Sequence, residues 1–343
     1  MKPLLKNILL LYLGLFFSGL SAQTAAQRKH PKFPAFETKA KEFRAAYDQG
    51  NFRAAATSGE VMLKLALEIM GAKDPMVGVV YGNLGTVYKH LGDFDKAIVY
   101  HEKDIAISRE VHGEKSAETA SGYDNIGLAY HDKGAFDKAL EFAEKSLQIK
   151  LAALGEKHIE TALSYNNVGA AWESKGDHKK AIQYHEKALA IRKAVKGASH
   201  PDVAQTLDNL GVAWGGTGDL KKAAKFSAEA LAIRLAAFGE DHPDTVLSYY
   251  NTGVAFRRIG SLDKAIDYLT KALKGWELRP ELNSVDIINT NFHLGAAYRD
   301  KKNLKKATRH LEAAYNLSLR LRGPDYPDTQ KLKALLDKTK AGK

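Results

Sequence analysis

Residues 165–184 read YNNVGAAWESKGDHKKAIQY. The side chains of Tyr165, Val168 and Trp172 are three and four positions apart, which is the spacing of one face of a helix. Gly176 and the aspartate after it break the pattern, and a second stripe with helical spacing starts at Ala181. The segment therefore predicts two helices joined by a tight turn.

This helical hairpin recurs six times without an insertion, at intervals of 42 residues. The recurring glycine is found at Gly85, Gly127, Gly169, Gly211, Gly253 and Gly295. No stretch shows sustained period-two alternation, so the sequence predicts an all-α fold. Because one hairpin cannot bury its apolar face alone, we expect the units to stack into a single solenoid.

An alanine follows each recurring glycine twelve positions later, as Ala97 follows Gly85. We expect these two small residues at the point where the helices of a hairpin cross most closely. A larger side chain there would push the helices apart and destabilise the fold.

The run L-G-x-x-Y at residues 84–88, followed by G-D-F-D-K-A at residues 92–97, resembles the tetratricopeptide repeat. The 42-residue spacing, and linkers such as GEDHPDT at residues 239–245, are similar to the kinesin-light-chain-like subgroup, whose arrays occur in many bacterial proteins. The resemblance implies a right-handed αα superhelix of about seven hairpins plus a C-terminal capping helix. It also implies that the first helices line a concave groove that binds peptides or helices, although it specifies no partner.

The repeats divide the chain into five parts. These are a signal peptide at residues 1–22, a flexible lead-in at 23–35, a degenerate N-terminal repeat at 36–77, six 42-residue units at 78–329 and a basic C-terminal capping helix at 330–343. The first repeat is degenerate because Lys41 and Ala46 replace the usual asparagine and aromatic residue. Terminal repeats of a solenoid need a polar outer face, which the C-terminal helix is expected to supply.

The first 22 residues have the layout of a secretory signal peptide. Lys2 and Lys6 form a basic start, residues 8–20 form an apolar core, and Ser21 and Ala22 form a small-residue exit. We therefore expect an exported protein, periplasmic or secreted. The alternative is a membrane anchor that stays uncleaved, although the core is shorter than a spanning helix of about 20 residues. Contact with a membrane is expected only in that case.

The formal net charge of +11 is unevenly distributed. Residues 299–343 hold 13 Lys and Arg against 5 Asp and Glu, a surplus of 8, so most of the basicity is C-terminal. The export signal argues against nucleic acid as a partner. The lysines that remain candidates for contact with acidic lipid, cell-wall polymer or an acidic protein face are Lys331, Lys333, Lys338 and Lys340. The other interpretation is a solvated cap surface.

The residues two positions before the recurring glycines form a predicted ladder along the groove. They are Asn83, Asn125, Asn167, Asn209, Asn251 and His293. A carboxamide both donates and accepts hydrogen bonds, so a ladder of this kind suits the main chain of an extended peptide. The alternative is that each side chain bonds locally to a neighbouring helix, and the sequence leaves both open.

Two aromatic residues and three arginines extend the candidate groove. Tyr250 and Phe292 directly precede ladder positions and are candidate anchors, because aromatic residues are frequent binding hot spots. Arg257, Arg258 and Arg299 lie further along the same helices and make one end of the predicted groove basic. We therefore expect a protein or peptide ligand with acidic or aromatic residues. The alternative is a solvated helix end.

The chain has no cysteine, which excludes disulfides, thiolate nucleophiles and cysteine-ligated metals. His101 and His185 each precede a glutamate, as in a zinc-protease helix, but the second histidine of that motif is missing. We expect these two histidines on the surface. No phosphate loop or catalytic dyad recurs, so we expect no metal, no cofactor and no enzymatic activity.

The sequence thus predicts a non-catalytic protein-interaction scaffold that binds a peptide or helix in its groove outside the cytoplasm. The alternative is an envelope-surface or polyanion-binding or assembly protein that acts through the basic C-terminal end. A homo-oligomer also remains open, if repeat faces are left uncovered.

Overall fold

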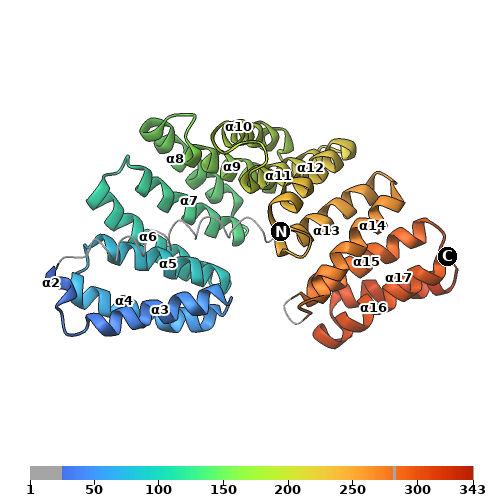
Figure 1. Ribbon diagram of the computed structural model, residues 1–343, viewed down its shortest axis with the longest axis horizontal. Helices are drawn as coiled ribbons and strands as arrows, with labels where there is room; N and C mark the ends of the chain where they lie inside the picture. Colours follow the sequence, from blue (N-terminus) through green and yellow to red (C-terminus); the bar gives the residue numbers. More distant parts are fainter. Residues whose placement is uncertain (1–24, 281–282, 343) are drawn as a thin grey trace. The chain divides into compact units, whose positions relative to one another are not determined.

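The structure is a computed structural model that describes residues 25–280 and 283–342. The predicted signal peptide at residues 1–22 lies outside the described residues. Within them the chain forms 16 α-helices and no strand, which confirms the all-α prediction (Figure 1). None of the described helices is both long and apolar enough to cross a membrane.

The chain divides into two compact units, with the boundary inside α10 between Ile191 and Arg192. In the first unit, the short helix α2 (Ala25–Arg28) precedes four hairpins. They pair α3 (Phe33–Asp48) with α4 (Phe52–Met70), α5 (Pro75–His90) with α6 (Phe94–His112), α7 (Ala117–Asp132) with α8 (Phe136–Leu154), and α9 (Ile159–Ser174) with α10 (His178–Lys196).

The second unit repeats the same plan. Its hairpins pair α11 (Pro201–Gly216) with α12 (Leu220–Phe238), α13 (Pro243–Arg258) with α14 (Leu262–Glu277), and α15 (Ser284–Asp300) with α16 (Leu304–Arg322), and α17 (Pro327–Lys340) follows. In both units the second helix of a hairpin packs against the first helix of the next, as α6 does on α7 and α14 on α15. The seven hairpins and the final helix agree with the sequence-based prediction.

Both ends of the described chain are closed by apolar side chains. The first hairpin begins at Phe33, whose buried ring lies 6.0 Å from that of Phe36, so this helix starts ahead of residue 36. At the other end, Leu332 of α17 is buried against Ile288 and Ala314 of the preceding hairpin. The last helix is therefore a packed cap, with its lysines on the outer side.

The recurring glycines do lie where the helices of a hairpin cross. A Cβ atom added to Gly85 would come within 2.6 Å of the His101 ring on α6, and one added to Gly253 within 2.6 Å of Leu269 on α14. The expectation that His101 and His185 lie on the surface is wrong, because both rings are buried in this contact. The glycine leaves room for the residue sixteen positions later, which is histidine opposite Gly85 and Gly169 and leucine opposite Gly253.

The linker histidines have a structural role at helix starts. His158, His200 and His242 are the N-cap residues of α9, α11 and α13, and each ring accepts a hydrogen bond at Nδ1 from the backbone N–H two positions later. These bonds satisfy backbone donors that have no partner inside the helix.

The tight turn inside each hairpin requires a positive φ. Gly260 has φ 78°, whereas the equivalent residue of the last hairpin is Lys302, with φ 61°. A side chain at a positive φ is disfavoured by contact between Cβ and the backbone. The last hairpin thus carries a local strain that the preceding one lacks.

Candidate functional site

First helices of successive hairpins are joined by contacts between residues 43 positions apart. In the first unit, the hydroxyl of Tyr47 lies 3.1 Å from Nε2 of His90, and Nε2 of His131 lies 2.7 Å from the hydroxyl of Ser174. In the second unit, Arg257 on α13 contacts Asp300 on α15 at 3.5 Å. These polar contacts close the space between the C-terminal ends of neighbouring first helices.

Gly215 interrupts this series in the second unit. Its partner 43 positions later is Arg258. Because glycine has no side chain, Arg258 donates from Nη2 to the carbonyl oxygen of Gly215 at 3.4 Å. A Cβ atom at Gly215 would lie 3.1 Å from Nη1 of Arg258. The glycine therefore makes room for the guanidinium between α11 and α13.

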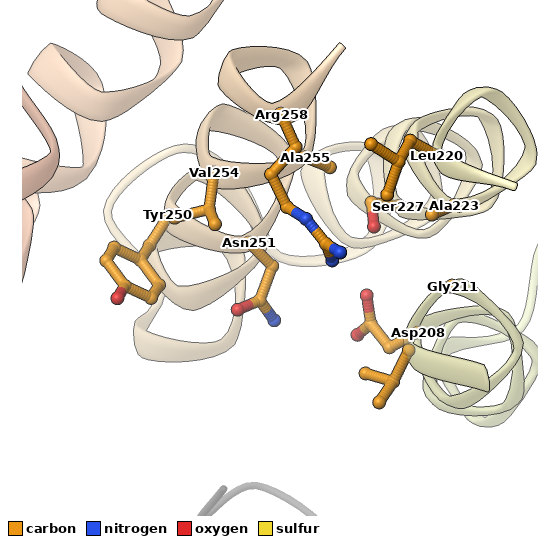
Figure 2. A pocket seen from close by; sticks show the side chains of 11 residues that line it. Asp208, Gly211, Leu220, Ala223, Ser227, Tyr250, Asn251, Val254, Ala255 and Arg258 are labelled. Carbon is orange, nitrogen blue, oxygen red and sulfur yellow. The ribbon is translucent and has the colours of Figure 1, made fainter. Parts of the chain in front are cut away.

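A cavity of about 160 Å³ opens beside this break (Figure 2). It is lined by Asp208, Gly211, Val212, Leu220, Ala223, Ser227, Tyr250, Asn251, Val254, Ala255 and Arg258. Its walls combine small and apolar side chains with a carboxylate, a carboxamide and a guanidinium. Few polar groups in a mostly apolar concavity are typical of a ligand site.

Asp208 brings a partly satisfied carboxylate to the cavity. Its Oδ2 pairs with Nη1 of buried Arg234, which also donates to the hydroxyl of Ser248. Its Oδ1 is buried and has no hydrogen-bond partner among the described residues. Burial raises the pKa of Asp208, and the neighbouring Arg234 only partly opposes this shift.

The opposite wall comes from α13. Figure 2 shows the guanidinium of Arg258 and the carboxamide of Asn251 pointing toward the space in front of Asp208. No ion pair within 4.0 Å joins Arg258 to any described carboxylate. Val212 lies at the rim and is 60% exposed. The cavity thus offers donors on one side, an acceptor on the other, and an apolar edge.

The ladder residues of the first unit lie in its interior. Asn83 is only 1% exposed, and both of its amide atoms lack a partner among the described residues. Asn125 and Asn167 are also buried, and Nδ2 of Asn167 donates to Oδ1 of Asp124 at 3.0 Å. For Asn167 this is the local bond to a neighbouring helix that the structural alternative describes.

The ladder residues of the second unit are less buried. Asn209, Asn251 and His293 are half-buried, and of these Asn251 lines the cavity. The His293 ring makes edge contacts with the rings of Tyr250 at 5.7 Å and Phe292 at 5.1 Å. Burial lowers the pKa of His293 to about 4, so the imidazole is neutral at pH 7. It therefore adds no positive charge to this face.

The two candidate anchors are half-buried in apolar clusters. Phe292 packs against the cluster formed by Ile288, Ala314 and Leu332. Tyr250 packs against Trp276 and its neighbours and also borders the cavity, and burial raises its pKa to about 12. Of the two, only Tyr250 is among the residues that line the cavity.

The three predicted arginines have different surroundings. Arg257 pairs with Asp300, Arg258 enters the cavity, and Arg299 is half-buried near the end of α15. Of the three, only Arg258 lines the candidate site, and the charge of Arg257 is compensated by Asp300.

Sequence reasoning missed Asp208 and Gly215. A signal for them exists in the repeat: the residue four positions after each recurring glycine is polar and charged or ionisable in five units, but glycine in one. The series is Lys89, His131, Glu173, Gly215, Arg257 and Arg299. A repeat with glycine in place of a long side chain at this contact between helices leaves space there. Among the described residues no group of three or more His, Asp or Glu side chains is placed to hold a metal ion.

The fold and the repeat geometry define a helical-repeat protein of stacked hairpins. A family model described as tetratricopeptide repeat matches residues 76–152, 137–194, 160–236 and 202–277, which together span more than half of the chain. The chain belongs to the tetratricopeptide repeat family. Proteins with this repeat generally act as non-catalytic interaction scaffolds.

Solved structures agree with this assignment. BtubC (BKLC) from P. vanneervenii is 28% identical, with 66% of this chain and 92% of that chain covered and a TM-score of 0.52. A putative kinesin light chain from Podospora anserina is 19% identical, with 60% and 98% covered and a TM-score of 0.51. The quorum sensor NprR from B. thuringiensis is 14% identical, with 98% and 97% covered and a TM-score of 0.58. No curated protein matches the chain significantly by sequence.

Proposed function

We propose that this protein is a peptide-binding scaffold whose binding site includes the cavity between α11 and α13 in the second unit. The observation that carries the proposal is the lining of that cavity, in which the carboxylate of Asp208 lies opposite Arg258 and Asn251 among small and apolar side chains. A mostly apolar concavity with a small number of polar groups is the usual form of a ligand site.

The apolar rim supports the same role. Val212 is exposed next to the half-buried Val254, and Tyr250 borders the same space. An extended peptide can cover such a rim with its own apolar groups while a polar side chain enters the cavity. The acidic or aromatic character of the ligand is part of this proposal, and it is supported by Tyr250 in the cavity lining and by the positive charge of Arg258.

A peptide array tests this proposal. The full chain is applied to a positional-scanning array of octapeptides. Each peptide is attached to the support at its C-terminus through a secondary amide, so it has no C-terminal carboxylate or primary carboxamide. We expect selective binding that Val212→Glu weakens at least tenfold, because the new charge must be desolvated when the rim is covered.

The matched control is Val99→Glu. Val99 is 48% exposed on α6 in the first unit, on the second helix of its hairpin, and it does not line the cavity. We expect Val99→Glu to bind as the unchanged protein does. Equal loss in both variants, or no selective binding by the unchanged protein, would contradict the proposal.

The alternative site at the basic C-terminal end is less favoured because most of its lysines already have acidic partners. Lys331 pairs with Asp328 at 3.3 Å, Lys333 with Asp337 at 2.8 Å, and Lys340 with Glu312 at 2.7 Å. Exposed pairs of this kind reduce the local positive potential that a polyanion needs. Binding of the full chain to anionic vesicles or to heparin, abolished by Lys338→Glu, would reverse this ranking.

Export is part of the proposal and depends on residues 1–22 alone. Expression of the full chain in a bacterial host, followed by fractionation, tests it. We expect the protein in the periplasmic fraction or the medium, with a mature N-terminus at Gln23, and cytoplasmic retention when residues 2–22 are deleted. A full-length chain in the membrane fraction would instead indicate an uncleaved anchor.

A further inference from the structure

We propose that one edge of the second unit, where the turns of its three hairpins lie, binds a linear acidic polysaccharide. This turn edge consists of residues 212–226, 254–268 and 296–310, and each segment contains the turn between the two helices of a hairpin. The proposal goes beyond the peptide-binding function and does not depend on it. It follows from the charge of the turn edge, from its ion pairs and from the surroundings of its aromatic rings.

The turn edge is strongly basic. Its three segments hold 12 Lys and Arg against 4 Asp and Glu. The equivalent segments of the first unit hold 9 Lys and Arg against 8 Asp and Glu, and they are residues 44–58, 86–100, 128–142 and 170–184. Both units are built from the same repeat, so the surplus of positive charge is a property of the second unit and not of the repeat itself.

The charges of the three turns act together. Within the second unit α12 packs against α13, and α14 packs against α15, so the hairpins lie side by side with their turns at the same edge. Packed helices are about 8–10 Å apart. The Debye length at an ionic strength of 0.1 M is about 10 Å, so charges on neighbouring turns are only partly screened from one another. The turn edge therefore carries one continuous positive potential.

Most of the positive charge in the last hairpin is not compensated. Asp300 pairs with Arg257 at 3.5 Å, and Asp263 pairs with Lys301. The other basic residues of segment 296–310 form no ion pair within 4.0 Å with a described carboxylate, and they are Arg299, Lys302, Lys305, Lys306 and Arg309. In this respect the turn edge differs from α17, where most lysines have acidic partners.

Two of these lysines occupy positions that the local backbone disfavours. Lys302 has φ 61° at a turn position that is glycine in each of the other six hairpins. Lys305 lies in the first turn of α16, where the helix dipole favours acidic side chains. Its equivalents in three other hairpins are Asp95, Asp137 and Asp263. Residues that oppose local structural preferences favour a role in binding over a role in folding.

The aromatic rings at the turn edge are engaged within the protein. Nζ of Lys222 lies 3.6 Å from the centre of the Trp214 ring, and Nζ of Lys306 lies 5.2 Å from that of the Tyr298 ring. The other face of Tyr298 is used as well, since its ring stacks on His310. Single-stranded nucleic acids gain much of their affinity by stacking bases on open aromatic rings. The turn edge therefore favours a polyanion that is bound by charge and not by stacking.

The turn edge also has little apolar surface. Among the described residues of its three segments, Val212 is the one exposed large hydrophobic side chain, and it lies at the rim of the cavity. Binding to a lipid surface is strengthened by apolar side chains that enter the headgroup region. An acidic polysaccharide needs only charged and polar contacts, and its repeated anionic groups can reach more than one turn at once.

Fluorescence anisotropy with labelled heparin oligosaccharides and the full chain tests the proposal, with heparin as the probe. We expect a dodecasaccharide to bind at least about tenfold more tightly than a tetrasaccharide, because only the longer chain spans several turns. Its affinity should fall between about 50 mM and 200 mM NaCl, as counterions compete for the turn edge. An oligothymidylate of similar length and vesicles of phosphatidylglycerol and phosphatidylcholine should bind more weakly than the dodecasaccharide in the same buffer.

A double variant locates the binding surface. Lys221→Asp with Lys305→Asp reverses an exposed charge on two turns, and aspartate already occupies this position in other hairpins. We expect dodecasaccharide binding to weaken at least about tenfold. The matched control is Lys274→Glu with Arg320→Glu, which changes the net charge equally at exposed positions near the C-terminal ends of α14 and α16, away from the turns. The control should weaken binding less than about threefold.

A single variant adds a test that does not burden the fold. Lys302→Gly restores the glycine of the other turns, and it should weaken dodecasaccharide binding by about two- to threefold. Circular dichroism checks that every variant is folded. Losses confined to the turn-edge variants support the proposal. It is overturned if the dodecasaccharide does not bind, if the oligothymidylate or the vesicles bind more tightly, or if the control loses as much affinity as Lys221→Asp with Lys305→Asp.

Discussion

Lys150 and Asp124 form an ion pair of 2.9 Å in the interior of the first unit, and both side chains are almost completely buried. Lys150 is on α8, and Asp124 on α7 also accepts hydrogen bonds from Ser164 and Asn167 of α9. Asp124 therefore connects three helices of two successive hairpins. Arg234 and Asp208 occupy the equivalent positions in the second unit, where Oδ1 of Asp208 has no hydrogen-bond partner among the described residues.

Removing the lysine should destabilise the first unit strongly. In Lys150→Met the carboxylate of Asp124 stays buried without its counterion, and such losses cost about 3–5 kcal/mol. Urea denaturation should show the lower free energy of unfolding, and the double variant Lys150→Met with Asp124→Asn should recover much of it. Lys157→Met, at an exposed position, is the control and should change the free energy by less than about 0.5 kcal/mol. A loss in the double variant as large as in the single one would contradict this account.

Equivalent glycines should respond differently to alanine. A Cβ at Gly253 would come within 2.6 Å of Leu269, whereas at Gly127 the nearest atom is 3.3 Å away. We expect Gly253→Ala to destabilise by about 1–3 kcal/mol through overpacking, and Gly127→Ala to cost less, because the higher helix propensity of alanine offsets part of the strain. Thermal and urea midpoints of the two variants provide the comparison. Equal midpoints would show that α13 and α14 separate without cost.

His101 should make the protein less stable in acid. Burial lowers its pKa to about 3, so the folded state keeps the ring neutral while the unfolded chain takes up a proton below its ordinary value of 6.5. Stability is therefore lost as the pH falls from 6.5 toward 3, by roughly 3 kcal/mol between pH 7 and pH 4.

His101→Leu should remove this contribution, because Leu269 and Leu311 occupy the same place over the glycines of other repeats. Urea denaturation at pH 7 and pH 4 should show a smaller decrease in the variant than in the unchanged protein. His293, whose pKa is also lowered by burial, should contribute acid sensitivity in both proteins. If the two proteins lose the same free energy, the ring of His101 is not neutral in the folded state.

Lys302→Gly should stabilise the last hairpin. Lys302 has a φ of 61°, in the left-handed region, where a side chain costs about 1 kcal/mol relative to glycine. The reverse change, Gly260→Ala at φ 78°, should destabilise by a similar amount. Hydrogen exchange of the amides in α15 and α16 should slow in Lys302→Gly, and unchanged exchange there would contradict the assignment of strain to this turn.

Much of the fold is encoded locally and could be predicted. The 42-residue recurrence of the residues at Asn83, Gly85 and Ala97 identifies the hairpin. The glycine and the alanine recur because the two helices of every hairpin pack closely at these positions. Helix starts such as Pro201 and Pro243 were also visible, since proline is tolerated in the first turn. What the repeat pattern did not reveal was which polar residues are buried. The rings of His101 and His185 fill the space over a glycine, and a sequence shows residue types but not the space around them.

The candidate site was predicted only in part. Asn251, Tyr250 and Arg258 belong to the predicted set and line the cavity, but Asn83, Asn125 and Asn167 are interior residues. Asp208 and Gly215 did not stand out because each is one member of a series that varies between repeats. Their importance arises from contacts with other helices, Gly215 with Arg258 and Asp208 with Arg234.

The sequence by itself determined the hairpin, its repetition and the all-α class, because helix periodicity, turn glycines and small crossing residues act within a few tens of residues. Only the tertiary structure decided where the cavity opens and which groups face it. Arg258 meets the glycine of the preceding first helix rather than a side chain, and Oδ1 of Asp208 is left without a partner. Whether a polar atom is satisfied depends on the helix packed against it, and that neighbour is chosen by the fold.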